Sequence, residues 1–88
     1  MKQFKLLVKD YLTQYVVGLR KKRGFSQEKM AERLHITGRA YGDLERGKYC
    51  FSAVSLLAML LMLNETELKE FFDGLREEEG TGKSYDVA

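Results

Sequence analysis

The sequence predicts an all-α fold: a compact domain of five helices over residues 1–79, followed by a disordered, flexible C-terminal tail over residues 80–88. Three observations support this prediction. Apolar residues recur at three- and four-residue spacing along most of the chain, which is the period of an amphipathic helix. Glycines and small hydroxyl residues stand between these stretches. No segment alternates apolar and polar residues as a strand does, and 88 residues suffice for one core.

The first helix is predicted over residues 4–23, because one apolar stripe follows helical spacing through this segment. Its last turn contains four consecutive basic residues, which suit the negative end of the helix dipole. Gly24 follows as a typical stop residue. Ser26 then stands where an N-cap is needed, so a second helix of about two turns is predicted over residues 27–34.

The third helix is predicted over residues 38–46, with Thr37 as its N-cap and Gly47 as its end. A short loop follows. Ser52 is the next candidate N-cap, and it precedes a fourth helix over residues 53–63. This fourth segment is apolar nearly all round. We therefore expect it at the centre of the core.

The fifth helix is predicted over residues 66–78, with Phe71, Phe72 and Leu75 on one side. These three side chains exceed what a short closing helix needs, so they form one candidate surface for a second copy of the chain. The other candidate surface lies on the extended first helix, at Phe4, Leu7 and Val8.

The net charge of +2 conceals two halves of opposite sign. Residues 1–50 contain twelve basic and five acidic residues, whereas residues 51–88 contain three basic and eight acidic residues. The basic half favours a polyanionic partner, most simply nucleic acid. The single cysteine, Cys50, excludes an internal disulfide and fits a reducing cytoplasm.

Several other classes of protein find no support in the sequence. One His and one Cys cannot form a zinc finger. The longest apolar stretch is shorter than the roughly 20 residues that span a bilayer, and no signal peptide is evident. No nucleophile stands beside a base, and no glycine-rich phosphate loop is present. We therefore expect no enzyme, no metal, no cofactor, no membrane partner and no small-molecule ligand.

The informative stretch is residues 19–47, LRKKRGFSQEKMAERLHITGRAYGDLERG. It contains two short helices joined by a tight turn, with the small residue Ala31 inside the first of them. The combination of SQE, Ala31, Leu34 and LERG at this spacing resembles the lambda repressor and Cro-like, XRE-type helix-turn-helix family. The resemblance covers roughly residues 12–72. It implies a bacterial or phage regulator, expected to be a repressor, that inserts the 38–46 helix into the major groove of double-stranded DNA.

The resemblance also implies roles for particular residues. The positions that face base edges are Gly38, Arg39, Gly42 and Asp43. The positions beside backbone phosphates are Gln27, Thr37, Arg46, Lys48 and Tyr49. Arg20 and Glu45 match a pair that forms a structural ion pair in this family.

This chain departs from the family pattern at three places. His35 stands where the turn usually has glycine, and a left-handed backbone is expected there. Tyr41 replaces an aliphatic residue and is expected in the core. Two base-facing positions are glycines, so base recognition depends on few side chains. Arg39 can donate to guanine, while Asp43 can accept from cytosine or can hold a neighbouring arginine in place.

One such domain covers only a half-site, so we expect a homodimer on DNA with two half-sites about one helical turn apart. A second reading is an antitoxin-like or anti-repressor interaction module of the same fold, with weak or no DNA binding. The two glycines and the acidic second half of the chain favour that alternative. Salt-dependent DNA binding distinguishes the two.

Overall fold

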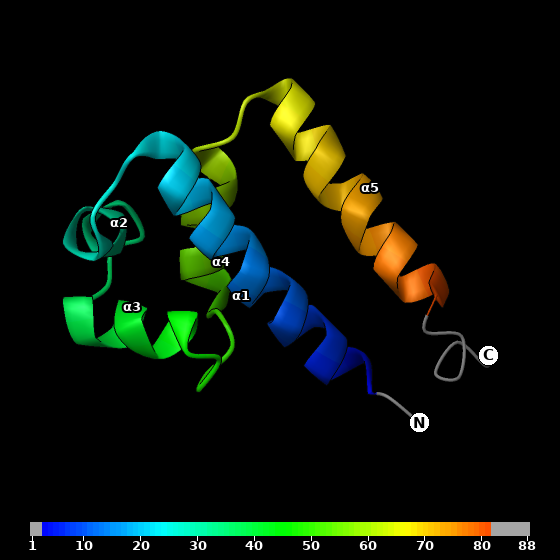
Figure 1. The fold of residues 1–88 in the computed structure, drawn as a ribbon, viewed down its shortest axis with the longest axis horizontal. Coiled ribbons are helices and arrows are strands. Elements are labelled where there is room, and N and C mark those ends of the chain that lie inside the picture. Colours follow the sequence, from blue (N-terminus) through cyan, green and yellow to red (C-terminus); the bar gives the residue numbers. More distant parts are fainter. Residues whose placement is uncertain (1–2, 82–88) are drawn as a thin grey trace.

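The structure, a computed structural model, describes residues 3–81 and has no strand in that range. Its helices are α1 (Phe4–Arg23), α2 (Gln27–Arg33), α3 (Gly38–Glu45), α4 (Ala53–Leu61) and α5 (Glu65–Thr81). This architecture confirms the predicted fold class. Figure 1 shows α1 through the middle of the molecule, with α2 and α3 on one side and α5 on the other. Within residues 3–81, no helix combines the length and the hydropathy needed to cross a bilayer.

Hydroxyl side chains determine where three of the helices begin. Each hydroxyl oxygen accepts the backbone N–H three residues further on, at 3.0 to 3.1 Å, and so satisfies a donor that the first turn leaves free. The residues that do this are Ser26, Thr37 and Ser52. Gly24 and Gly47 follow α1 and α3 with left-handed φ values of 70° and 72°. Both kinds of signal act over a few residues, which is why the sequence shows them.

Three helices end earlier than predicted. Leu34 and Arg46 are the C-caps of α2 and α3, one residue after each helix ends. The predicted end of α4 at residue 63 is two residues too late. The N–H groups of Met62 and Leu63 bond to carbonyls three residues back, at 3.0 and 3.1 Å, so the chain tightens into a narrower turn there.

The fifth helix is longer than predicted at both ends. It begins at Glu65, because the Asn64 side chain accepts the N–H of Glu67 at 2.8 Å, and a Glu67 oxygen accepts the N–H of Asn64 at 3.1 Å. It continues to Thr81, into the segment expected as a tail, because its consecutive glutamates are good helix formers. The remainder of the predicted tail, residues 82–88, lies outside the described residues.

The core lies where α1 to α4 meet, and Phe71 of α5 packs into it. The largest fully buried side chains come from these helices and from the turn after α2: Val16, Met30, Leu34, Tyr41 and Met59. The predicted core position of Tyr41 therefore holds. The side chain of Ala31 is buried too, and its small size lets α2 and α3 pack closely.

The fourth helix is not buried on all sides, so the prediction that it lies at the centre of the core was wrong. Val54, Leu57 and Leu61 point into solvent, with Leu61 86% exposed. The neighbouring helices cover only one side of α4, so an apolar residue on the other side has nothing to pack against. We call Val54, Leu57 and Leu61 the α4 face.

The turn between α2 and α3 contains a strained residue, which the sequence predicted. His35 has a φ of 62°, and within residues 3–81 no other non-glycine residue has a positive φ. We expect His35→Gly to raise the free energy of unfolding by about 0.5 kcal/mol. Relief of the left-handed strain, about 1–2 kcal/mol, exceeds the entropy that glycine adds to the unfolded chain. Urea unfolding checks this, and a decrease with His35→Gly, or an increase with His35→Val, would contradict it.

Candidate nucleic-acid interface

The second and third helices, with the turn between them, position one exposed helix end. The N-terminal turn of α3 is open to solvent at Thr37, Gly38 and Arg39, whereas its C-terminal half is buried from Tyr41 to Leu44. Figure 1 places α3 at the edge of the molecule, on the opposite side of α1 from α5. The acidic fifth helix therefore does not cover the exposed end of α3.

A hydrogen-bond network around Glu45 fixes the orientation of α3. The Arg20 Nε donates to the Glu45 carboxylate at 2.6 Å, which joins α1 to α3. The hydroxyl of Tyr41 donates to the same carboxylate at 2.5 Å, and the Gln27 amide of α2 donates at 2.8 Å. Arg20 also donates to the carbonyl of Phe25 at 3.1 Å, in the α1–α2 loop. One carboxylate thus connects the three helices of the motif.

The protonation states of this network are well defined. Burial works to raise the pKa of Glu45, but the hydrogen bonds from Arg20, Tyr41 and Gln27 outweigh it and lower the pKa below its ordinary value. Burial, together with the hydrogen bond to Glu45, raises the pKa of Tyr41 well above its ordinary value. At neutral pH the carboxylate is therefore charged, and the phenol is a neutral donor.

Two of the four predicted base-facing positions are exposed. Gly38 and Arg39 both lie in solvent, and a Cβ at Gly38 would meet nothing within 4 Å. Arg39 forms no hydrogen bond or ion pair with any other residue in the range 3–81, so its guanidinium is free to bind a ligand. Gly38 and Arg39 are therefore accessible to another molecule.

The other two predicted base-facing positions, Gly42 and Asp43, are buried in this structure. The Asp43 carboxylate accepts a hydrogen bond from Arg46, which is the second of the two uses that the sequence left open. The Arg46 side chain lies across Gly42. The family resemblance implies a phosphate contact for Arg46, and its guanidinium lies on the side of α3 that contains Gly42 and Asp43.

Apart from Arg46, the predicted phosphate-contacting residues lie at the start of α2, at the start of α3 and in the loop after α3. Lys48 and Tyr49 are exposed, and the Lys48 ammonium lies 5.5 Å from the centre of the Tyr49 ring, in cation–π contact. The Thr37 hydroxyl caps α3, and one Gln27 N–H bonds to Glu45. Both residues therefore hold the motif together, which the sequence did not indicate for Gln27.

The basic end of α1 has a role that the sequence missed. Arg23 donates twice to the Glu67 carboxylate of α5, at 2.8 and 2.9 Å, and Lys22 donates at 2.9 Å. These hydrogen bonds lower the pKa of Glu67 far below its ordinary value. The sequence indicated only that these basic residues suit the negative end of the helix dipole. The sequence signal available for Glu67 was its place three residues after Asn64, which marks the start of a helix. That signal does not show that Glu67 also pairs with Lys22 and Arg23 on α1.

The fifth-helix residues expected at a dimer interface differ in their exposure to solvent. Phe71 is only 2% exposed, because its ring packs against Tyr11 and Tyr15 at centroid distances of 5.5 and 4.8 Å. The prediction that Phe71 meets a second copy is therefore wrong. Phe72 remains exposed, and Leu75 is half-buried.

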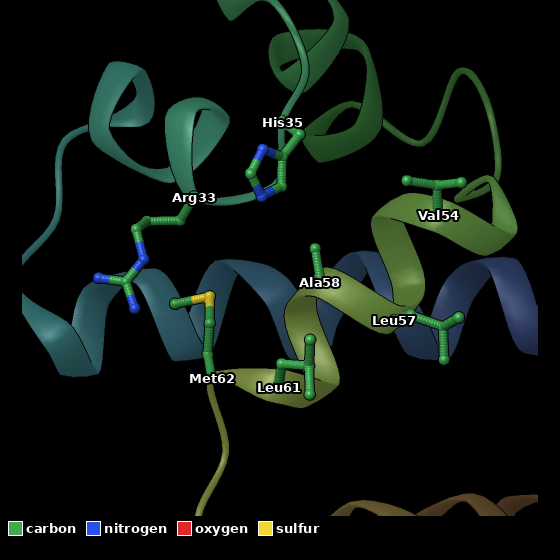
Figure 2. A pocket seen from close by; sticks show the side chains of 7 residues that line it. All are labelled: Arg33, His35, Val54, Leu57, Ala58, Leu61 and Met62. Atoms are coloured by element: carbon green, nitrogen blue, oxygen red, sulfur yellow. The ribbon is translucent and has the colours of Figure 1, made fainter.

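A groove of about 430 Å³ runs beside the α4 face. Figure 2 shows Arg33 and His35 on one side of it, projecting from the end of α2 and from the turn. The apolar side chains of α4 and of its C-cap form the other side: Val54, Leu57, Ala58, Leu61 and Met62. An apolar surface with a polar edge has the composition of a protein interface.

Comparison with known proteins gives one match. A family model described as helix-turn-helix matches residues 19–71, which is more than half of the chain and includes α2, α3 and α4 completely. No curated protein and no solved structure matches the chain.

Proposed function

The chain belongs to the XRE, lambda repressor-like helix-turn-helix family and is a DNA-binding regulator, and from this premise we propose that it is a sequence-specific repressor that inserts α3 into the major groove. The exposed N-terminal turn of α3, with the unpaired Arg39 on it, is the observation that carries the proposal. A major groove about 12 Å wide admits one such helix. The Glu45 network supplies the rigidity that groove insertion requires.

DNA binding depends on two kinds of contact, to base edges and to backbone phosphates. Arg39 donates two hydrogen bonds to a guanine edge, and this pair distinguishes guanine from other bases. Lys48 and Tyr49, in the loop after α3, contact the phosphates that flank the groove, as do Thr37 and the free N–H of Gln27. These phosphate contacts supply affinity without sequence preference.

The repressor acts as a homodimer, and the second copy covers the α4 face. In a two-fold dimer each patch meets its own equivalent, so the exposed α4 side chains of one copy pack beside those of the other. The three side chains of the α4 face supply the apolar centre, and Arg33 and His35 lie at its edge. A dimer joined here has two α3 ends, as a DNA site with two half-sites requires.

Selection of bound sequences from a random DNA pool at about 0.15 M salt tests the function. A repressor of this kind is expected to select one sequence element in two symmetric copies. The logarithm of its affinity should fall linearly with the logarithm of salt concentration, by about 0.9 per phosphate contact. Absence of salt-dependent binding to any DNA would refute the proposal and would favour an interaction module of the same fold.

The Lys48→Ala variant tests the phosphate contacts. For each bound copy of the chain we expect a loss of affinity of about fivefold to tenfold at 0.1 M salt, for selected and random DNA alike, and a salt slope smaller by about 0.9, so that a bound dimer shows about twice this change in slope. Fluorescence anisotropy with labelled duplexes at four salt concentrations measures both values. Lys69→Ala is the matched control, because Lys69 is an exposed lysine on α5. A Lys48→Ala effect confined to one DNA sequence would contradict the assignment.

A further inference from the structure

The side chain of Arg46 is held in a defined place on the third helix. It donates to the Asp43 carboxylate, one turn back along the chain, and that carboxylate is buried. A Cβ added at Gly42 would lie 3.3 Å from the Arg46 Nη1, so the guanidinium occupies the space that a side chain at 42 would need. Arg46 itself keeps 67% of its side chain exposed.

The fold alone does not explain this arrangement. Glycine is unfavourable inside a helix, and no positive φ at Gly42 requires it. An exposed arginine pairing with aspartate three residues away contributes little to stability. The pair does have another consequence. One guanidinium N–H is used by Asp43, and the remaining donors stay in solvent on the side of α3 that contains Gly42 and Asp43.

We propose that Arg46 determines sequence specificity by donating to a base edge in the major groove, with Asp43 as its positioning residue and Gly42 as the space in which its guanidinium lies. The chemistry fits guanine, whose O6 and N7 accept a bidentate pair from arginine. The pairing with Asp43 favours this place for the guanidinium before DNA binds, which reduces the side-chain freedom lost on binding. The inference deepens the proposed function, because it supplies the side chain that Gly42 cannot.

Two variants test the inference with the full chain. Gly42→Ala displaces the Arg46 guanidinium by a few tenths of an ångström but leaves every charge in place. Arg46→Lys keeps the positive charge that a phosphate contact needs but removes the planar fork that a bidentate base contact needs. Each variant, and the native chain, is measured against the selected DNA site and against sites with each base of one half-site replaced in turn. Gly18→Ala and Arg76→Lys are the matched controls, because both positions are exposed and Gly18 has nothing within 4 Å of an added Cβ.

Arg46→Lys is expected to lose about 5- to 150-fold of discrimination at one base pair, and Gly42→Ala a smaller part of it at the same base pair. Both variants should bind random DNA almost as the native chain does. Gly42→Ala should also raise the urea midpoint, so its loss cannot come from unfolding. Discrimination retained at every base pair in Arg46→Lys would overturn the inference and leave the proposed function standing. A native chain that binds no DNA would overturn both.

Discussion

Replacing Glu45 with alanine is expected to lower the free energy of unfolding by about 3 kcal/mol. The change leaves the hydroxyl of Tyr41, a fully buried residue, without its acceptor and leaves the mostly buried guanidinium of Arg20 without its counter-charge. A buried neutral donor without a partner costs about 1–3 kcal/mol, and a broken buried ion pair costs as much or more. A domain of this size has roughly 4–13 kcal/mol of stability in total.

Urea unfolding of Glu45→Ala measures this effect as a lower midpoint with an unchanged slope. Glu32→Ala is the matched control, because Glu32 is an exposed glutamate of the same motif and its ion pair with Lys29 lies on the surface. That control should change stability by no more than about 0.5 kcal/mol. Equal losses in the two variants would show that the Glu45 network does not anchor α3.

The same network makes stability depend on pH. The pKa of Glu45 is lower in the folded chain than in the unfolded chain, so the folded form takes up a proton less readily. The stabilisation is complete above the ordinary glutamate pKa of about 4.3, and it is lost as the pH falls through the lower, folded pKa. Glu45→Gln, which cannot titrate, should therefore lose less stability than the native chain as the pH falls below about 5.

The sequence predicted those features that depend on neighbouring residues. The caps at Ser26, Thr37 and Ser52 are hydrogen bonds across three residues, so the residue type and its place before an apolar segment are enough. The left-handed turn at His35 followed in the same way, because glycine is the usual residue at that position of the family pattern.

Distant contacts and the coverage of apolar faces could not be predicted in this way. Helical spacing shows which residues of a helix share a face, but it does not show which neighbour covers that face. Phe71 and Leu57 are both apolar residues on helices, yet α1 covers the first and nothing within residues 3–81 covers the second. Arg23 and Glu67 are 44 residues apart in the chain, so their pairing depends on how α1 and α5 pack.

The candidate site, like the fold, could be predicted only where it depends on neighbouring residues. The exposed end of α3 followed from the motif, but the place of the Arg46 guanidinium depends on the absent side chain of Gly42 and on the burial of Asp43. The sequence left open that Asp43 holds a neighbouring arginine, but it did not show that Gly42 leaves room for the guanidinium of that arginine. Their combination becomes apparent only when the turn of the helix brings positions 42, 43 and 46 to one side.

Leu61→Glu is expected to abolish the proposed dimer and to lower affinity for a DNA site with two half-sites by about 100-fold or more. Leu61 is 86% exposed in the single chain, so a charge there costs the isolated domain little. At the centre of a two-fold contact the same charge meets its own equivalent in the partner and loses its water. Affinity for a single half-site should stay within about twofold of the native value, because α3 is unchanged.

Light scattering at tens of micromolar measures the oligomeric state, and titration of one-half-site and two-half-site duplexes measures the two affinities. Phe72→Glu is the informative control, because Phe72 is the most exposed of the fifth-helix residues that the sequence favoured for the interface. The α4 assignment requires Phe72→Glu to remain dimeric and Leu61→Glu to become monomeric. The reverse result would assign the interface to α5, and a native chain that is monomeric with and without DNA would exclude the dimer. In both cases the exposure of the α4 face would need another physical cause.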